Sequence, residues 1–328
     1  VKNIENNQFI PKTNPVSADV FLIAVPTPFL SNKDSRNNDI PSPNIEFVEQ
    51  AAEMIAKLCK PNNLVIIEST SPVGTSEKIF NKILKKTKLD KNDLNLAYCP
   101  ERVLPGNILS ELINNNRVIG GINKESSLAA EKFYKVFCKG EIRITNSKTA
   151  ELVKLTENAY RDINIAFANE VSMICHEENI NTDELINIAN AHPRVDILKP
   201  GCGVGGHCIA VDPYFIAAKF PKITPLIQTA REVNLNKTNW CKEIIKEEYF
   251  KINSCTEKKP VIGILGLTYK PNVGDLRESP ALKIFNSLKE EGFPTIACEP
   301  YNDQNNENFI FDLKTVLTDS DILVRLVA

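Results

Sequence analysis

The residues best suited to chemistry lie in one glycine-rich stretch, GCGVGGHCIAVDP, at positions 201–213. Four glycines within six residues allow the backbone to approach another group closely. Cys208 follows them, and a cysteine on such a loop is sterically open, as a nucleophile must be; nearby positive charge would favour its thiolate. Cysteines outside disulfides are usually buried structural residues. We interpret the other eight cysteines in that way, and the loop context favours a functional Cys208.

A second group of polar side chains shares one face of a predicted helix. Lys154 and Asn158 are four residues apart, and Asp162 follows one turn later. A lysine beside an asparagine at this spacing can hold one substrate oxygen between a charge and an amide. A solvated helix face has the same pattern, and from the pattern alone it is the better interpretation.

Several polar residues follow directly after predicted strands, where ligands bind in open α/β sheets. Glu101 follows the apolar run at 94–98 and is a candidate general base, although a loop ion pair with Arg102 would also explain it. Three further residues in such positions are Pro26, Thr27 and Thr70. Their hydroxyl and backbone groups suit contact with a cofactor, but alone they are typical of ordinary turns.

Two cations follow the predicted strand at 261–267. They are Lys270 and Arg277, within the stretch LTYKPNVGDLRESP. Cations at the carboxyl end of a strand suit an anionic ligand such as a diphosphate, and a charged surface loop is the alternative. The three histidines form no metal-binding pattern, and His192 is more typical of a polar lining than of a ligand.

The elements that must position these residues are typical of an α/β protein: two Rossmann-like domains with parallel sheets, joined by a central helical region. Apolar runs predict strands at 19–25, 64–68 and 94–98, with helices at about 44–60 and 75–86. After 260, strands at 261–267, 295–298 and 321–327 alternate with helices at 281–290 and 312–317.

The central region is predicted to be helical throughout. Apolar residues at spacings of three and four predict one buried stripe on a long helix that begins near 148: Leu152, Leu155, Ala159, Ile163, Ala166, Val171 and Ile174. Further helices are expected at about 182–191 and 224–250. The chain thus divides into residues 1–147, 148–250 and 258–328, with loops at 31–44 and 302–308.

A dinucleotide-binding domain begins with a strand, a glycine-rich turn and a helix. Only 18 residues precede the first predicted strand and none is glycine, so this turn is absent from the chain. Gly201, Gly203 and Gly206 do spell Gly-x-Gly-x-x-Gly, but they follow no strand, and Pro213 argues against a helix after them. The chain begins with Val1 and ends inside a predicted strand, so we expect a fragment in which both α/β domains are truncated.

Composition excludes several classes of protein. The net charge of −2, from 39 basic and 41 acidic residues, argues against a nucleic-acid surface. The chain contains no run of 18 apolar residues, so the sequence predicts no membrane-spanning helix. The nine cysteines are scattered without a Cys-x-x-Cys pair, which predicts neither a disulfide framework nor a metal site and fits a reducing cytoplasm.

Together and in order, seven motifs resemble those of the UDP-glucose/GDP-mannose dehydrogenase family. They are AVPTPF (24–29), ESTSPVGT (68–75), CPERVLPGN (99–107), TAELVKLTEN (149–158), FANE (167–170), GVGGHCIAVDP (203–213) and GLTYKPNVGDLRESPA (266–281). Within the family, HPRVDILKPG (192–201) and HCIAVDPYF (207–215) most resemble the branch that oxidises UDP-N-acetyl-D-mannosamine. Cys202 stands where relatives often carry proline.

The resemblance implies a four-electron, NAD-dependent oxidation of a nucleotide-sugar C6 alcohol to the carboxylate. Residues 1–147 would bind NAD, 148–250 would pair subunits in a homodimer or higher homo-oligomer, and 258–328 would bind UDP. Cys208 would attack the intermediate aldehyde, and the thiohemiacetal would be oxidised to a thioester. Lys154 and Asn158 would hold the C6 oxygen.

The resemblance also implies the remaining roles. Asp212 would assist proton transfer or orient Lys154, and Glu101 would activate the hydrolytic water, which Thr70 would position. Cofactor contacts would come from Pro26, Thr27, Thr70 and Arg277. Substrate contacts would come from Glu101, Arg102, Lys154, Asn158, His192, Arg194, Gly205 and Lys270.

Three alternatives remain open at this point. The substrate could be UDP-N-acetylglucosamine, UDP-glucose or GDP-mannose. The chain could be an inactive remnant that keeps only a dimerising core, since the cofactor turn is missing. A decarboxylating β-hydroxyacid dehydrogenase would share the layout and the Lys-x-x-x-Asn pair, but it has no use for the His-Cys loop.

Overall fold

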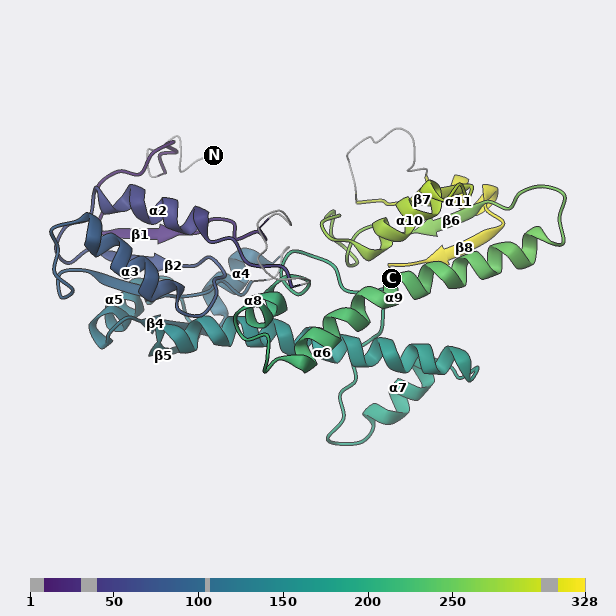
Figure 1. Cartoon of the computed structure of the whole chain (residues 1–328), viewed down its shortest axis with the longest axis horizontal. Coiled ribbons are helices and arrows are strands. Elements are labelled where there is room, and N and C mark those ends of the chain that lie inside the picture. The colour runs from purple at the N-terminus through teal and green to yellow at the C-terminus, as the bar shows by residue number, and fades with distance from the viewer. Residues whose placement is uncertain (1–8, 31–39, 104–106, 302–311, 328) are drawn as a thin grey trace. The chain divides into compact units, whose positions relative to one another are not determined.

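The computed structural model describes residues 9–30, 40–103, 107–301 and 312–327 (Figure 1). The chain forms two compact units, Val1–Leu155 and Thr156–Ala328. The loops expected at 31–44 and 302–308 lie outside the described residues, apart from 40–44. In the described parts of the chain, no helix is both long and apolar enough to span a membrane.

The first unit is built on a five-stranded sheet with the order β1-β2-β3-β4-β5. Its strands are β1 (Val20–Ile23), β2 (Leu64–Ile67), β3 (Asn95–Tyr98), β4 (Arg117–Gly121) and β5 (Ile142–Asn146). The first three lie where apolar runs predict strands. All neighbours are parallel except β3 and β4, which are antiparallel. A fully parallel sheet was expected, and the pair of β3 and β4 departs from it. The chain leaves β3 and enters β4 at the same edge of the sheet, so the two strands run in opposite directions.

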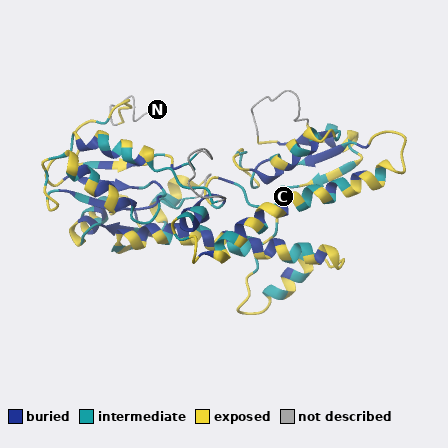
Figure 2. Cartoon of the chain, viewed as in Figure 1, coloured by how far each residue is buried: buried dark blue, intermediate teal, exposed yellow. Residues whose placement is uncertain are grey.

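Helices cover both faces of this sheet. They are α2 (Glu46–Ala56), α3 (Thr75–Lys86) and α5 (Lys124–Tyr134), whereas α4 (Ile108–Asn114) has no buried residue. Because side chains alternate along a strand, Val65 and Ile67 pack with α2 and α3, whereas Leu64 and Ile66 pack with α5. Strand β2 is buried along its whole length, whereas the edge strand β5 has no buried residue (Figure 2). Burial on both faces explains why β2 is an uninterrupted apolar run.

The second unit combines helices with a three-stranded parallel sheet of order β7-β6-β8. Its helices are α7 (Thr182–Asn190), α8 (Asp212–Lys219), α9 (Pro225–Asn253), α10 (Pro280–Glu290) and α11 (Leu313–Asp319). Its strands are β6 (Ile262–Leu265), β7 (Thr295–Cys298) and β8 (Ile322–Arg325). The predicted α/β class is confirmed. Ile245 and Tyr249 of α9 pack with α10 on the core of this sheet.

One helix, α6 (Ser147–Glu177), begins in the first unit and ends in the second. The expected apolar stripe is only partly buried: Leu155 and Ala166 are buried, but Leu152 is 40% exposed and Ile174 is 60% exposed. The interpretation as one continuous apolar face is therefore wrong. The buried residues of α6 also include polar ones, namely Glu151, Lys154, Asp162 and Asn169.

Glu151 shows what this polar face does in the first unit. Its carboxylate accepts hydrogen bonds from the backbone N–H groups of Gly74 (2.5 Å) and Ser76 (2.7 Å), and from the Ser76 hydroxyl (2.7 Å). These donors belong to the first turn of α3, whose N-terminal N–H groups lack partners within the helix. A buried carboxylate there is stabilised by both the hydrogen bonds and the helix dipole.

Replacing Glu151 by Gln is expected to destabilise the fold. An amide cannot accept with both terminal atoms, so at least one buried donor of α3 loses its partner. The expected loss in free energy of unfolding is about 1–3 kcal/mol, measured by urea denaturation. The matched control is Glu77→Gln on the same helix, because Glu77 pairs with Lys148 on the exposed surface. An equal effect of the two variants would contradict this account.

Candidate active site

At the carboxyl edge of β1 and β2, the structure brings together the turns that were expected to touch a cofactor. Ser69 ties them to each other: its hydroxyl accepts from the Val25 N–H (2.7 Å) and donates to the Val25 carbonyl (2.8 Å). Thr27 is buried, Thr70 is half-buried and Pro26 is exposed. These hydroxyl and backbone groups suit the uncharged part of a dinucleotide. The N-terminus of α3 does not suit its pyrophosphate, because Glu151 already occupies it.

Glu101, the candidate base, forms an ion pair with Arg117 of β4. Its Oε2 lies 3.3 Å from Nη2 of Arg117, and its Oε1 accepts from the Arg102 N–H at 2.7 Å. The side chain of Glu101 is 33% exposed and that of Arg117 only 4%. The sequence suggested Arg102 as partner because it is adjacent. Arg117 gave no local signal, since only the pairing of β3 with β4 brings it close.

A second carboxylate, Glu68, lies in the same polar cluster. Tyr134 donates to its Oε1 at 2.5 Å, but burial is the larger effect and raises the pKa of Glu68. Burial likewise raises the pKa of the Cys99 thiol to about 11, and that of Cys202 to about 12. Thiols with such pKa values are poor nucleophiles at neutral pH, which supports a structural role for both cysteines.

On α6, Lys154 and Asn158 occupy positions four residues apart, and Lys154 is buried. Asn158 donates from Nδ2 to Oδ2 of Asp212 at 2.5 Å. Asp212 is itself buried, at the first residue of α8. This contact orients the Asn158 amide. The amide–carboxylate pair could not be predicted, since 54 residues separate its members.

Asp162 is part of a buried polar network, so the solvated helix face favoured by the pattern is wrong at this position. Its Oδ1 accepts from Arg231 (2.6 Å) and from Asn234 (2.8 Å), both on α9. Burial raises the pKa of Asp162, although Arg231 opposes this effect. Asn234 also accepts from Asn169 (2.9 Å), whose own Oδ1 accepts from the Gly201 N–H (2.9 Å). The network therefore anchors the start of the glycine-rich stretch.

The glycines that precede Cys208 allow close packing within the second unit. Gly206 has φ +85°, and its N–H donates to the carbonyl of Arg277 at 3.1 Å. A Cβ at Gly206 would lie 2.8 Å from the ring of Tyr269, and one at Gly205 would lie 2.6 Å from the carbonyl of Glu278. The spacing that resembles a phosphate-binding turn thus serves contact with the loop at 266–279.

Cys208 lies at the exposed end of this stretch, as a nucleophile requires. Its carbonyl accepts from the Asp212 N–H at 2.8 Å, which starts a turn that leads into α8. The expectation that no helix follows was wrong. Pro213 lies in the first turn, where proline needs no hydrogen-bond donor and is favoured.

Arg277 and Lys270 lie in the loop that contacts the Cys208 stretch. Arg277 forms a two-pronged ion pair with Asp275, with Nη2 at 2.7 Å from Oδ2. Hydrogen bonds from Arg277 hold the pKa of Asp275 below its usual value. Lys270 is half-buried. His192 and Arg194 lie exposed in the segment between α7 and α8.

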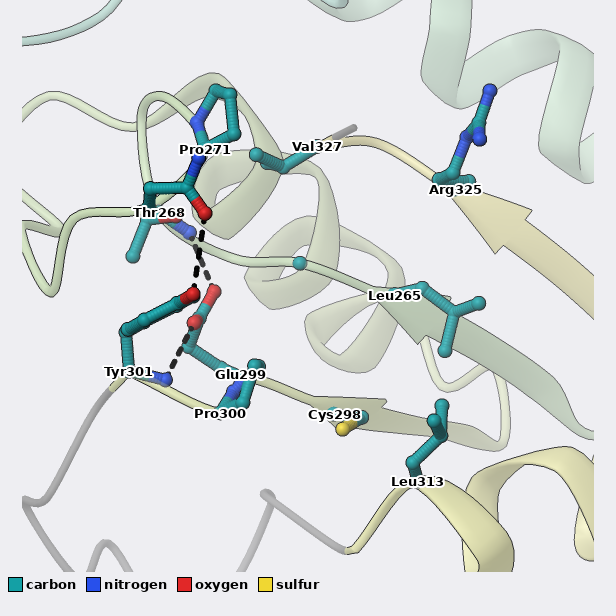
Figure 3. A pocket seen from close by; sticks show the side chains of 12 residues that line it. Leu265, Thr268, Pro271, Cys298, Glu299, Pro300, Tyr301, Leu313, Arg325 and Val327 are labelled. Atoms are coloured by element: carbon teal, nitrogen blue, oxygen red, sulfur yellow. Dashed lines mark hydrogen bonds between the residues drawn. The ribbon is translucent and has the colours of Figure 1, made fainter.

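A pocket of about 290 Å³ opens at the carboxyl ends of β6, β7 and β8 (Figure 3). Glu299 forms part of its wall and is held by three backbone groups: it accepts from the N–H groups of Leu267 (2.8 Å), Thr268 (3.1 Å) and Tyr301 (3.0 Å). In the described ranges, no group of three or more His, Cys, Asp and Glu side chains could hold a metal ion.

Three family models match the chain consecutively. They are those of the NAD binding domain (residues 2–138), the central domain (148–236) and the UDP binding domain (263–328) of the UDP-glucose/GDP-mannose dehydrogenase family. The chain belongs to the UDP-glucose/GDP-mannose dehydrogenase family. The resemblance stated from the motifs is confirmed.

Similar proteins carry the name of the expected branch. UDP-N-acetyl-D-mannosamine dehydrogenase of Campylobacter jejuni is 45% identical over 100% of this chain and 82% of its own length. The protein of the same name from Salmonella typhimurium is 47% identical over 96% and 77%. The solved UDP-N-acetyl-mannosamine dehydrogenase Cap5O of Staphylococcus aureus has a TM-score of 0.86 and 39% identity over 99% of this chain and 75% of that one.

As a member of this dehydrogenase family, the protein is an NAD-dependent enzyme that oxidises a nucleotide sugar. This excludes the β-hydroxyacid dehydrogenase considered from the layout. Sequence reasoning found the exposed cysteine and the polar pair on α6. It missed Arg117 and the Asp162–Arg231–Asn234–Asn169 network, because residues distant in sequence make these contacts.

Gly206→Ala is expected to destabilise the enzyme more than Gly292→Ala. Both glycines have φ +85°, so both substitutions impose the same backbone strain. A Cβ at Gly292 meets nothing within 4 Å, whereas one at Gly206 meets Tyr269. Overpacking of this kind costs about 1–3 kcal/mol, which chemical denaturation of both variants would resolve. Equal losses in the free energy of unfolding would contradict this account, because they would show that the Tyr269 ring moves aside at no cost in stability.

Proposed function

We propose that the enzyme oxidises UDP-N-acetyl-D-mannosamine at C6 to the carboxylate, through a thioester on Cys208. The names of relatives at 45–47% identity support the substrate. The single observation that supports the covalent route is the exposed Cys208, held at the start of a turn directly before Asp212, which is buried and bonded to the half-buried Asn158. A relative named NDP-N-acetyl-D-galactosaminuronic acid dehydrogenase, 46% identical, makes a galactosamine sugar the second candidate.

In the first oxidation, Lys154 and Asn158 hold the C6 oxygen as it loses its proton. A cation and an amide aimed at one oxygen stabilise the negative charge that develops there. The turns of Pro26, Thr27 and Thr70, together with Arg277, would hold NAD, which would supply the hydride acceptor for both oxidations. Asp212, fixed by its bond to Asn158, carries the proton away through water.

In the second half, the Cys208 thiolate attacks the C6 aldehyde and forms a C–S bond. Loss of a second hydride from C6 converts the thiohemiacetal to a thioester. Water then attacks the carbonyl carbon, its proton passes to Glu101, the C–S bond breaks and the thiolate is restored. Thr70 positions the water. Covalent attachment keeps the aldehyde from escaping between the two oxidations.

The remaining assignments concern binding. Substrate contacts come from Glu101, Arg102, Lys154, Asn158, His192, Arg194, Gly205 and Lys270. The exposed positions of His192 and Arg194 are compatible with contact to a bound sugar or to a second subunit. We place the enzyme in the cytoplasm, where NAD and nucleotide sugars are formed.

We further propose that α6 pairs two copies of the chain. Its exposed apolar residues Tyr160 (69%), Phe167 (53%) and Ile174 (60%) recur every seven positions. A seven-residue spacing keeps side chains on one helix face, and this face is apolar enough to need a cover. The same helix in a second copy matches it in length and character.

The substrate proposal is tested by NADH formation with the purified protein. Two NADH per UDP-N-acetyl-D-mannosamine are expected, with much slower turnover of UDP-N-acetylgalactosamine, UDP-N-acetylglucosamine and UDP-glucose. A preference for another of these sugars would overturn the substrate and keep the mechanism. No NADH with any sugar would favour the inactive remnant.

Cys208→Ala is expected to abolish acid formation. Without the thiolate no thioester forms, so at most one NADH per sugar should appear and free aldehyde should be trapped by hydroxylamine. Cys255→Ala is the matched control, because Cys255 is also exposed and lies in the turn after α9. Acid formation by Cys208→Ala at the rate of the control would refute the covalent route.

Phe167→Glu is expected to weaken subunit pairing. A carboxylate in an apolar contact is desolvated without a partner, so the dissociation constant should rise at least about tenfold, a change of about 1.4 kcal/mol. Sedimentation velocity over a range of concentrations measures it. Val136→Glu is the control, since Val136 is 83% exposed and lies outside α6. Unchanged sedimentation of Phe167→Glu would place the interface elsewhere.

A further inference from the structure

Arg117 is a charged side chain enclosed by the first unit. Its guanidinium lies 4.7 Å from the ring centroid of Tyr134 and 5.7 Å from that of Phe137. Its Nη2 lies 3.3 Å from Glu101 and 3.3 Å from the carbonyl of Leu112. Nε has no hydrogen-bond partner among the described residues. Removing a guanidinium from water this far is costly, and the one carboxylate that it pairs with is the candidate base.

We propose that Arg117 is a positioning residue that holds the carboxylate of Glu101 in one orientation for thioester hydrolysis. This inference rests on the proposed function, in which Glu101 accepts the proton of the attacking water.

Both oxygens of the Glu101 carboxylate are held by groups of different kinds. Arg117 contacts Oε2 from the buried side, and the Arg102 N–H binds Oε1 at 2.7 Å. Two anchors fix the plane of the carboxylate. Each oxygen keeps a lone pair, because each makes one of these contacts and a carboxylate oxygen can accept two. Glu101 remains one-third exposed, so a water can reach it while Arg117 stays covered.

The surroundings of Glu68, the neighbouring carboxylate, explain why Arg117 pairs with Glu101. Glu68 lies in the same cluster and would compete for the cation. The Tyr134 hydroxyl donates to Glu68 at 2.5 Å and supplies it with a neutral partner. Burial disfavours charge on Glu68 and raises its pKa. The positive charge of Arg117 is thereby directed to the exposed carboxylate.

The consequence is specific to one chemical step. In hydrolysis, the water oxygen bonds to the carbonyl carbon, its proton moves to Glu101, and the C–S bond breaks to release the Cys208 thiolate. Both hydride transfers precede this step. A disordered Glu101 should therefore slow the breakdown of the thioester more than its formation.

The test is Arg117→Lys, with Arg143→Lys as the matched control. Arg143, on the adjacent strand β5, also pairs with a glutamate, but both partners are exposed. We expect Arg117→Lys to give a burst of two NADH per active site and then a steady state about tenfold slower, a part of the roughly 10²–10⁴-fold contribution of a general base. Mass spectrometry should show the acyl group retained on Cys208. Lysine keeps the charge but lacks the guanidinium fork, in which Nη2 contacts Glu101 and Leu112 while Nη1 contacts Cys99.

Two further variants separate failure of the inference from failure of the proposed function. Glu101→Gln should accumulate the same thioester; if it does not, the role of Glu101 is wrong. If Glu101→Gln accumulates it and a folded Arg117→Lys does not, the inference is overturned. The double variant should hydrolyse no more slowly than Glu101→Gln alone, because Arg117 acts only through Glu101. A hydrolysis rate lowered by the effects of both substitutions together would contradict the claim that Arg117 acts through Glu101.

Glu101→Asp tests the same contact without altering Arg117, in case Arg117→Lys does not fold. The carboxylate is retained but withdrawn from Arg117 by one methylene. We expect slowed hydrolysis with retained thioester. Hydrolysis at the full rate would show that the contact with Arg117 does not matter.

Discussion

The second unit depends on one buried ion pair, between Asp162 of α6 and Arg231 of α9. Their atoms lie 2.6 Å apart, and the side chains are 0% and 4% exposed. Two charges removed from water are stable only when they pair closely and their other atoms find partners. Asn234 supplies one more hydrogen bond, while Asp162 Oδ2 and Arg231 Nε find none among the described residues. The pair is thus a costly contact that is broken as soon as α6 slides along α9.

This constraint extends to the reactive loop through a chain of amides. Asn234 binds both Asp162 and Asn169, and Asn169 holds the N–H of Gly201. Glu151 caps α3 about five turns before Asn169 on α6, and between them Asn158 holds Asp212 at the start of α8. Within each unit, the polar face of α6 therefore fixes the ends of the segments that are bonded to it. Apolar contacts tolerate small shifts, but hydrogen bonds do not, so a polar face determines position more sharply than an apolar one.

The sequence predicts an element well when the residues that the element buries are apolar, and poorly when they are polar. The strands β2 and β7 and the helix α3 were found almost to the residue because their buried residues are apolar. The face of α6 was misjudged because Asp162 and Asn169 at helical spacing look like solvated residues. Their partners on α9 lie 65 or more residues away. Pro213 led to a different error, because it was taken as evidence against a helix. Proline breaks a helix in its interior but is favoured in its first turn, where Pro213 lies.

The candidate site shows the same limit for glycine. A Gly-x-Gly-x-x-Gly pattern reports at most that side chains are excluded, whatever excludes them, and here Gly201 has room for a Cβ. In a phosphate-binding turn the excluding group is the ligand. Here it is protein: Thr238 at Gly203 and Tyr269 at Gly206. The two cases differ in what precedes the glycines, a buried strand or the Lys199-Pro200 segment anchored through Gly201. The segment before the glycines therefore indicates correctly that they do not form a phosphate-binding turn. The structure gives the reason: the glycines allow the loop of Cys208 to pack against the loop of Arg277.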